Sequence, residues 1–254
     1  MADKKLWIGT SWKMNKTRAE ARSFAETLRA DPLSQSMDAQ LFVIPPFTAI
    51  ADVAERLSGS TVQIGGQNMH WASAGAWTGE ISAPMLRDVG ATLVELGHSE
   101  RRSHFGETGE TVALKVEAAL AHGLTPLICI GDTADEHRAG RTAEVLAKQV
   151  RVALSRVAAA DASKVLLAYE PVWSIGEGGV PADPAFAHAQ HLAIKALTLN
   201  LLGHALPVLY GGSVNPGNCR ALAAMPAIDG LFIGRAAWDA QGYLGIVRDV
   251  LSAV

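Results

Sequence analysis

Short apolar runs alternate with longer amphipathic stretches along the whole chain. The apolar runs predict β-strands, which lie at Leu6–Thr10, Gln40–Ile44, Thr61–Ile64, Thr92–Leu96, Thr125–Ile130, Val165–Tyr169, Pro207–Tyr210 and Leu231–Ile233. Between them, apolar residues recur at helical spacing and predict helices at Arg18–Arg29, Thr48–Leu57, Glu110–His122, Thr142–Ala159, Pro184–Leu202 and Gln241–Leu251. Unbroken alternation of strand and helix is typical of a parallel sheet.

The strand runs show no clean alternation of apolar and polar residues, so we expect both faces of the sheet to be covered. About eight such units predict an α/β fold of the closed (β/α)8 barrel type, forming a single domain over residues 1–254. An open, doubly wound sheet would give a similar pattern. No Gly-x-Gly-x-x-Gly follows the first strand, however, and no Ser/Gly-rich linker divides the chain.

Composition narrows the classes of partner. The chain of 254 residues is 49% hydrophobic and 19% charged, as expected for a soluble protein with a large core. Its net charge of −3 gives no general attraction to nucleic acid or to anionic membranes, so an anionic ligand must be bound by local positive charge.

The segment Met1 to Lys5 is too polar for a signal peptide, and no apolar run is long enough to span a bilayer. Cys129 and Cys219 lack metal-ligand spacing and fit a reducing compartment, so we expect a cytoplasmic protein.

Polar residues whose side chains could take part in catalysis follow several strands. In a parallel barrel the carboxyl ends of all strands open on one face, so these residues are expected to converge there. An ammonium group at Lys13 would need an anion, such as a phosphate. Pro171 favours an extended Glu170, whose carboxylate could then act as a base. His98 begins a predicted helix, and a helix N-terminus favours a neutral imidazole. Taken singly, each residue also has a purely structural interpretation: Lys13 as a surface lysine, Glu170 as a salt-bridged carboxylate and His98 as a core histidine.

Glycine-rich segments follow the last three strands. The loop after the sixth strand predicts a mobile lid, made of Trp173, Ser174, Ile175, Gly176, Glu177, Gly178 and Gly179. Gly211-Gly212-Ser213 and Gly234-Arg235 follow the seventh and eighth strands, where backbone N–H groups can bind a phosphate. The histidines other than His98 are interpreted as structural.

Together these strings resemble the triose-phosphate isomerase family along nearly the whole chain. The matching strings are Trp12-Lys13-Met14-Asn15, Gln67-Asn68, Trp77-Thr78-Gly79-Glu80-Ile81-Ser82, Gly97-His98-Ser99-Glu100-Arg101-Arg102, Tyr169-Glu170-Pro171-Val172-Trp173 and Tyr210-Gly211-Gly212-Ser213-Val214. The resemblance implies a TIM barrel in which Glu170 removes a carbon-bound proton beside a carbonyl. Neutral His98 would polarise that carbonyl, and Lys13 would stabilise the enediolate. Ser99 and Glu100 would support these groups.

The resemblance also implies the rest of the binding arrangement. Ser11, Gly176, Ser213, Gly234 and the backbone of Arg235 would contact a small phosphorylated sugar, and no metal or organic cofactor would be needed. Family members form homodimers, in which the third loop of one subunit inserts beside the active site of the other. Here that loop is 70–80, and its dimer contacts would include Trp77, Thr78 and Gly79.

Three departures from the family pattern lie near the expected substrate. Ser11 stands where the family usually has Asn, Arg235 replaces the second glycine of a Gly-Gly pair, and the lid ends in Gly178-Gly179-Val180-Pro181-Ala182. The smaller Ser11 leaves volume for an extra hydroxymethyl group. This combination is similar to the branch of the family that converts L-erythrulose 1-phosphate to D-erythrulose 4-phosphate.

Other functions remain open from the sequence. The triose reaction, between dihydroxyacetone phosphate and glyceraldehyde 3-phosphate, would require only that Ser11 is tolerated. An aldolase could use Lys13 as a Schiff-base nucleophile, but a nearby phosphate and carboxylate would keep that lysine charged. A barrel that only binds sugar phosphates would not need Lys13, His98 and Glu170 together.

Overall fold

Eight parallel strands close into a barrel in chain order. The computed structural model describes residues 6–176 and 178–253. Each strand pairs with the next, and β8 pairs with β1, which confirms the predicted (β/α)8 barrel and rules out the open sheet. The strands are β1 (Leu6–Ser11), β2 (Ala39–Ile44), β3 (Gln63–Gly66), β4 (Leu93–Leu96), β5 (Thr125–Ile130), β6 (Leu166–Tyr169), β7 (Val208–Tyr210) and β8 (Gly230–Ile233).

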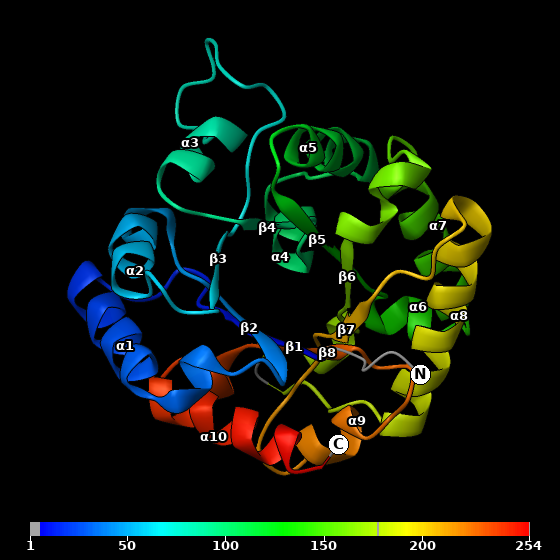
Figure 1. The fold of residues 1–254 in the computed structure, drawn as a ribbon. Coiled ribbons are helices and arrows are strands. Elements are labelled where there is room, and N and C mark those ends of the chain that lie inside the picture. The colour runs from blue at the N-terminus through cyan, green and yellow to red at the C-terminus, as the bar shows by residue number, and fades with distance from the viewer. Residues whose placement is uncertain (1–5, 177, 254) are drawn as a thin grey trace.

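Helices surround the barrel as an outer ring (Figure 1). They are α1 (Arg18–Ala30), α2 (Ile50–Arg56), α3 (Ala83–Asp88), α4 (Ser99–His104), α5 (Gly109–Ala121), α6 (Ala134–Arg138), α7 (Thr142–Ala153), α8 (Pro184–Leu202), α9 (Cys219–Ala223) and α10 (Ala240–Leu251). Short 3-10 turns at Pro32–Gln35, Phe47–Ala49, Ala159–Lys164, Val172–Ser174 and Arg235–Ala237 complete the connections. No helix in the described residues combines the length and the apolar character that a membrane span requires.

The core has two layers, one inside the barrel and one between the strands and the helices. Along β4, Leu93 belongs to the inner layer, whereas Val94 and Leu96 belong to the outer one. Phe42 and Phe232 stack inside the barrel with ring centroids 5.8 Å apart. Because both faces of each strand are buried, the sequence shows no clean apolar–polar alternation.

The third strand is displaced from its predicted position. The prediction was Thr61–Ile64, but β3 spans Gln63–Gly66. The hydroxyl of Thr61 donates to backbone carbonyls of Ser34 and Ser36, outside the sheet. Gly65 pairs with Leu93 of β4, and a Cβ there would lie 3.0 Å from the Leu93 side chain. The strand therefore extends into glycines that have little strand propensity but leave space for the neighbouring strand.

The predicted helix Thr142–Ala159 is too long. Helix α7 ends at Ala153, and the chain then turns toward β6. Leu154 and Val157 are buried in this turn, and their spacing of three residues imitates a helical pattern. The apolar periodicity therefore continues after the helical hydrogen bonds stop.

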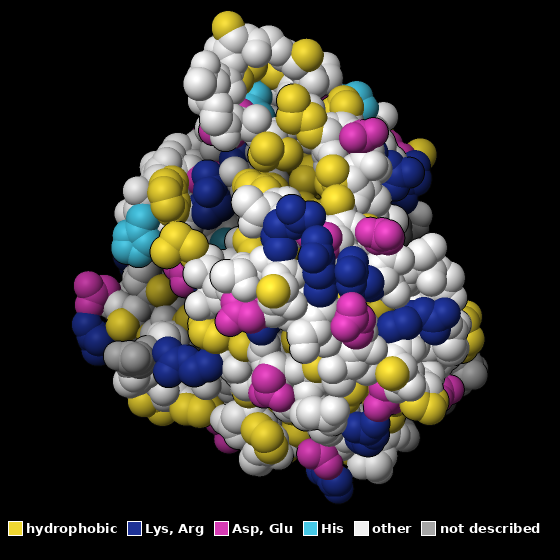
Figure 2. Space-filling model, turned by 90° about the vertical axis from the view of Figure 1, so that its left-hand side faces the viewer, with side chains coloured by type: hydrophobic (Ala, Val, Ile, Leu, Met, Phe, Trp, Pro, Cys, Tyr) yellow, Lys and Arg dark blue, Asp and Glu magenta, His cyan; other side chains and the backbone are white. Residues whose placement is uncertain are grey.

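The loop between β3 and α3 stands clear of the barrel, at the top of Figure 1. Figure 2 shows hydrophobic side chains on this projecting loop and on the surface below it. Within the loop, the His70 ring stacks on Trp71 and also contacts Trp77, with centroids 4.0 Å and 4.3 Å away. Trp77 is nevertheless 49% exposed. The loop therefore presents an ordered aromatic surface outside its own barrel.

Candidate active site

The carboxyl ends of the strands surround one main cavity of about 360 Å³. It collects side chains that are far apart in the sequence and that were singled out there. Its lining includes Ser11, Lys13, His98, Glu170, Ile175, Gly176, Ser213, Gly234 and Arg235. A second cavity of about 190 Å³ adjoins it and shares Ser11, Lys13 and His98. Convergence at one end of the barrel was the central expectation for these residues.

Lys13 follows β1 and extends into both cavities. Its backbone φ of +52° is unusual for a residue with a side chain. Gln67 holds this conformation, since its Nε2 donates to the Lys13 carbonyl at 2.8 Å. On the preceding peptide, Asn15 Nδ2 donates to the Trp12 carbonyl at 2.8 Å. Lys13 Nζ lies 2.6 Å from Glu100 Oε1, so the ammonium is held beside the cavity by one carboxylate.

His98 is the N-cap of α4, and its ring is buried. The backbone N–H of Glu100 donates to Nδ1 at 3.1 Å. Nδ1 therefore acts as an acceptor, and in the neutral ring the proton lies on Nε2. Burial, followed by the charge of Lys13, lowers the pKa of His98 to about 4. His98 can thus present a neutral Nε2–H donor to a ligand in the cavity.

Glu170 immediately follows β6, and its side chain is buried. Its backbone N–H donates to the Ile130 carbonyl at 2.8 Å, which continues the pairing of β6 with β5. Among the described residues, its Oε2 has no hydrogen-bond partner. Gly211 lies against the side chain, and a Cβ at that position would be 2.8 Å from Glu170 Cγ. The Glu170 side chain therefore fits here because residue 211 is a glycine, and few groups stabilise the negative charge of its carboxylate.

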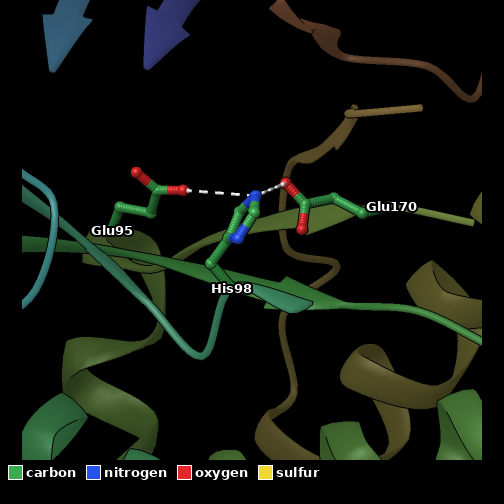
Figure 3. A group of neighbouring side chains, drawn as sticks. All are labelled: Glu95, His98 and Glu170. Atoms are coloured by element: carbon green, nitrogen blue, oxygen red, sulfur yellow. Dashed lines mark ion pairs between the residues drawn. The ribbon is translucent and has the colours of Figure 1, made fainter. Parts of the chain in front are cut away.

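His98 lies between two carboxyl groups, Glu95 and Glu170 (Figure 3). Its Nε2 is 3.7 Å from Glu170 Oε1 and 4.0 Å from Glu95 Oε1. Burial, followed by the charge of Glu95, raises the pKa of Glu170 to about 8. Burial also raises the pKa of Glu95 to about 7. A carboxylate destabilised in this way is a stronger base than an exposed one.

The same three side chains are the group in the described residues whose spacing could hold a metal ion. One donor atom from each lies within 4.8 Å of the others. An ion there would occupy a lone pair of Glu170 and would have to displace the proton from His98 Nε2. Proton abstraction by Glu170 and metal binding at this position would therefore compete.

Another part of the lining of the main cavity has the features of a phosphate site. Ser213, Gly234 and Arg235 line it after β7 and β8, and Gly176 contributes from the loop after β6. Gly176 has a φ of +87°, which favours glycine. Ser174 Oγ accepts from the Ser213 N–H at 3.4 Å and so ties the loop to the β7 end. Apart from its chain neighbours, a Cβ at Gly176 or Gly234 would meet no atom of the described residues within 4 Å, so the backbone at these two glycines is open to an anion.

One buried carboxylate, Asp132, holds the start of the proposed lid. It accepts from Tyr169 Oη at 3.1 Å and from Trp173 Nε1 at 3.3 Å. The His137 ring stacks on Trp173 at a centroid distance of 4.4 Å. Ser174 is also buried, and its hydroxyl donates to the Pro171 carbonyl at 2.8 Å.

The remaining predicted residues lie around the site or outside it. Of the lid residues, Ile175 and Gly176 line the main cavity, Gly178 and Gly179 are absent from its lining, and Glu177 lies outside the described residues. Glu100 lines the second cavity, whereas Ser99 begins α4 and lines neither. Trp77, Thr78 and Gly79 lie on the projecting loop, outside the lining of both cavities.

Three residues of the site were missed by sequence reasoning. Asp132 follows β5, so the strand-end argument could have found it. Glu95 lies two residues after Leu93 on β4 and shares its inward orientation, so strand parity could have identified a carboxylate inside the barrel. Trp238 Nε1 donates to the Ser11 carbonyl at 3.0 Å, a contact over 227 positions that no local pattern indicates.

The arrangement is suited to proton transfer on a small anionic carbonyl compound. Glu170 can act as the base, His98 can donate to a carbonyl oxygen, and Lys13 can stabilise the negative charge that forms there. The glycine-rich side can bind a phosphate at the same time.

Comparison with known proteins agrees with this geometry. Residues 6–250 match the family model described as triosephosphate isomerase. The L-erythrulose-1-phosphate isomerase of Brucella abortus (strain 9-941) is 60% identical over 244 residues, which cover 96% of this chain and 95% of that protein. The protein of the same name from Rhizobium rhizogenes is 57% identical over 247 residues, covering 97% and 95%. That from Rhizobium meliloti is 55% identical over 255 residues, covering 100% of both chains.

Proposed function

Because this chain belongs to the triosephosphate isomerase family, we propose that it interconverts L-erythrulose 1-phosphate and D-erythrulose 4-phosphate. Membership makes it a sugar-phosphate isomerase, and the proposal concerns the substrate and the roles of the site residues. The names of the relatives at 55–60% identity support the four-carbon substrate.

In the proposed mechanism Glu170 takes the proton from the hydroxyl-bearing carbon next to the carbonyl. His98 Nε2–H donates to the carbonyl oxygen, and Lys13 stabilises the enediolate that results. His98 gives its Nε2 proton to that oxygen and takes the proton of the neighbouring hydroxyl in return, while Glu170 delivers the carbon-bound proton to the former carbonyl carbon, so that the carbonyl moves by one position. Ser213, Gly234 and the Arg235 backbone bind the phosphate throughout. Gly176 and the rest of the lid exclude water from the intermediate.

The observation that supports a four-carbon substrate is the position of Ser11, which forms one wall of the site. Its hydroxyl donates to Glu95 Oε2 at 2.8 Å, so the side chain is held against the barrel interior. The second cavity of about 190 Å³ begins at this wall. Compared with a triose phosphate, the proposed substrate carries one more hydroxymethyl group, on the carbon that loses its proton. Space at Ser11 accommodates that group.

The triose reaction is the second candidate, because the same three groups would perform it. Side-by-side kcat/KM measurements for L-erythrulose 1-phosphate and dihydroxyacetone phosphate test the choice. We expect at least about a 100-fold preference for the four-carbon substrate. A preference for the triose phosphate would refute the proposal and leave the enzyme a triose-phosphate isomerase.

We further propose that the protein is a homodimer. The exposed Trp77 of the projecting loop is apolar, as are Met14, Phe47 and Phe105, exposed residues in the lining of the second cavity. Ser11 and Glu95 of the same lining are buried, so a partner loop would cover the cavity without displacing them. Complementary apolar surfaces of this kind favour association. Sedimentation equilibrium should give twice the chain mass of 26.7 kDa, and Trp77→Glu should shift the protein toward monomer. A monomeric wild-type protein would contradict the proposal.

We also propose a cytoplasmic location. Cys129 and Cys219 are both free and buried, as expected for a reducing compartment. The net charge of −3 supports the expectation that nucleic acids and membranes are not partners. Cell fractionation tests the location, and recovery of the protein in the membrane fraction or in an oxidising compartment would contradict it.

A further inference from the structure

Glu95 is a carboxyl group in the interior of the barrel. Leu93, two residues earlier on β4, packs in the inner apolar layer, and Glu95 has the same orientation. Glu95 is only 2% exposed. A buried carboxyl with few partners costs free energy, and an apolar side chain of similar size would stabilise the barrel better. The position therefore points to a role in binding rather than in stability.

The two oxygens of Glu95 are in different situations. Oε2 accepts from Ser11 Oγ at 2.8 Å. Among the described residues, Oε1 accepts only a long, weak hydrogen bond from Cys129 Sγ at 4.0 Å, and His98 Nε2 is also 4.0 Å away. Because Glu95 lines the second cavity together with Ser11 and His98, a ligand can supply a closer and stronger donor to Oε1. In Figure 3 Glu95 points toward His98 from the side opposite Glu170.

The two ends of the site fix how a substrate can lie. Its phosphate belongs beside Ser213 and Gly234, and its reacting carbons belong between Glu170 and His98. The end of the carbon chain without phosphate then points away from the phosphate side, toward Ser11 and Glu95. The proposed four-carbon substrate has a hydroxymethyl group there, beyond its two reacting carbons, whereas the chain of a three-carbon substrate ends at a reacting carbon.

Building on the proposed function, we infer that Glu95 and Ser11 form the subsite for the terminal hydroxyl of the four-carbon ketose phosphate. The hydroxyl donates to Glu95 Oε1, and Ser11 fixes the carboxyl by donating to Oε2. The pKa of Glu95, raised to about 7 by burial, allows pairing in both forms, since a protonated carboxyl can donate to the hydroxyl instead. A substrate without the hydroxyl leaves Oε1 with only the weak hydrogen bond from Cys129, which is the basis of discrimination.

The first experiment changes the substrate and uses the wild-type enzyme. The kcat/KM for L-erythrulose 1-phosphate is compared with that for its 4-deoxy analogue, which lacks only the terminal hydroxyl. We expect the analogue to react about 100-fold more slowly. Equal values would overturn the inference without any variant.

The second experiment changes the enzyme. Assays are run at pH 9, above the pKa of Glu170, so that the loss of the Glu95 charge does not change the ionisation of the base. Glu95→Leu should lower kcat/KM for L-erythrulose 1-phosphate about 30-fold more than that for the deoxy analogue, because any change in the basicity of Glu170 affects both substrates equally. Glu95→Gln keeps an acceptor for Ser11 and should lose less than Glu95→Leu. It also serves as the test if the leucine variant does not fold.

Cys129→Ala is the matched control. It removes the other neighbour of Oε1, and it should change both kcat/KM values by the same factor. Equal losses on both substrates in the Glu95 variants would instead mean that Glu95 acts on the catalytic groups, and would overturn the subsite. A wild-type enzyme that does not isomerise L-erythrulose 1-phosphate would refute the proposed function and the subsite with it. If the wild-type enzyme isomerises that substrate but the Glu95 variants lose the same factor in kcat/KM on both substrates, only the subsite would be refuted.

Discussion

Replacing the proposed base should make the protein more stable at high pH, in addition to inactivating it. The pKa of Glu170 is raised to about 8 from its ordinary 4.5, with burial as the main cause. The folded protein therefore binds this proton more tightly than the unfolded chain does. The contribution of Glu170 to wild-type stability must fall as the pH rises from about 4.5 to about 8, and Glu170→Gln removes that contribution.

The magnitude follows from the two pKa values. A difference of one in pKa corresponds to about 1.4 kcal/mol, so the free energy of unfolding of the wild type, relative to Glu170→Gln, should fall by about 4 kcal/mol between pH 5 and pH 9. The amide of the variant leaves its own buried donors unpaired, but this cost does not vary with pH. The charged and titratable neighbours are the same in both proteins, namely Lys13, Glu95, His98, Glu100 and Cys129.

Urea denaturation at several pH values, at one fixed protein concentration, measures the difference. The stability of the variant relative to wild type should rise with pH and level off above about pH 8. The isomerase activity of the variant should be lost at every pH. Parallel stability curves for the two proteins would refute the reasoning, because they would mean that Glu170 has an ordinary pKa in the folded state.

Four further predictions concern the site. Glu170→Asp should lower kcat by about 100-fold or more with little change in KM, because the carboxylate is drawn back by one methylene; a modest loss would exclude it as the base. Gly211→Ala places a Cβ against Glu170 and should lower kcat by about 100-fold, whereas Gly245→Ala in α10 has open space and should leave kcat unchanged. Lys13→Ala should weaken inhibition by inorganic phosphate by about 10-fold and also lower kcat; unchanged phosphate inhibition would contradict its electrostatic role. Zn²⁺ should inhibit competitively by binding the three side chains of Figure 3, and dialysis against EDTA should leave activity intact; loss of activity in EDTA would reveal a required metal.

The sequence was sufficient for the barrel and for the residues at its strand ends. Lys13, His98 and Glu170 directly follow buried strands or their short extensions, and parallel closure brings such positions together. The hydrophobic pattern of the sequence and the topology that it predicts were therefore enough to predict that these residues lie together. The prediction did not require any knowledge of side-chain packing.

Features that depend on packing were not predicted. The boundaries of β3 are set by the fit of Gly65 against Leu93 on another strand. Glu95 was overlooked because it lies within an apolar run rather than after it, and its role depends on Ser11, 84 positions away. Contacts of this range leave no periodic signal in a single sequence.

The bonds made by Asp132 have a mechanical consequence. This one side chain ties Tyr169, which precedes Glu170, to Trp173, where the proposed lid begins. Any rocking of that segment is therefore transmitted to the peptide that carries the reactive carboxylate. In the proposed mechanism, movement of the lid and fine positioning of the proton acceptor are therefore coupled, and selection for faster product escape would have to act on both.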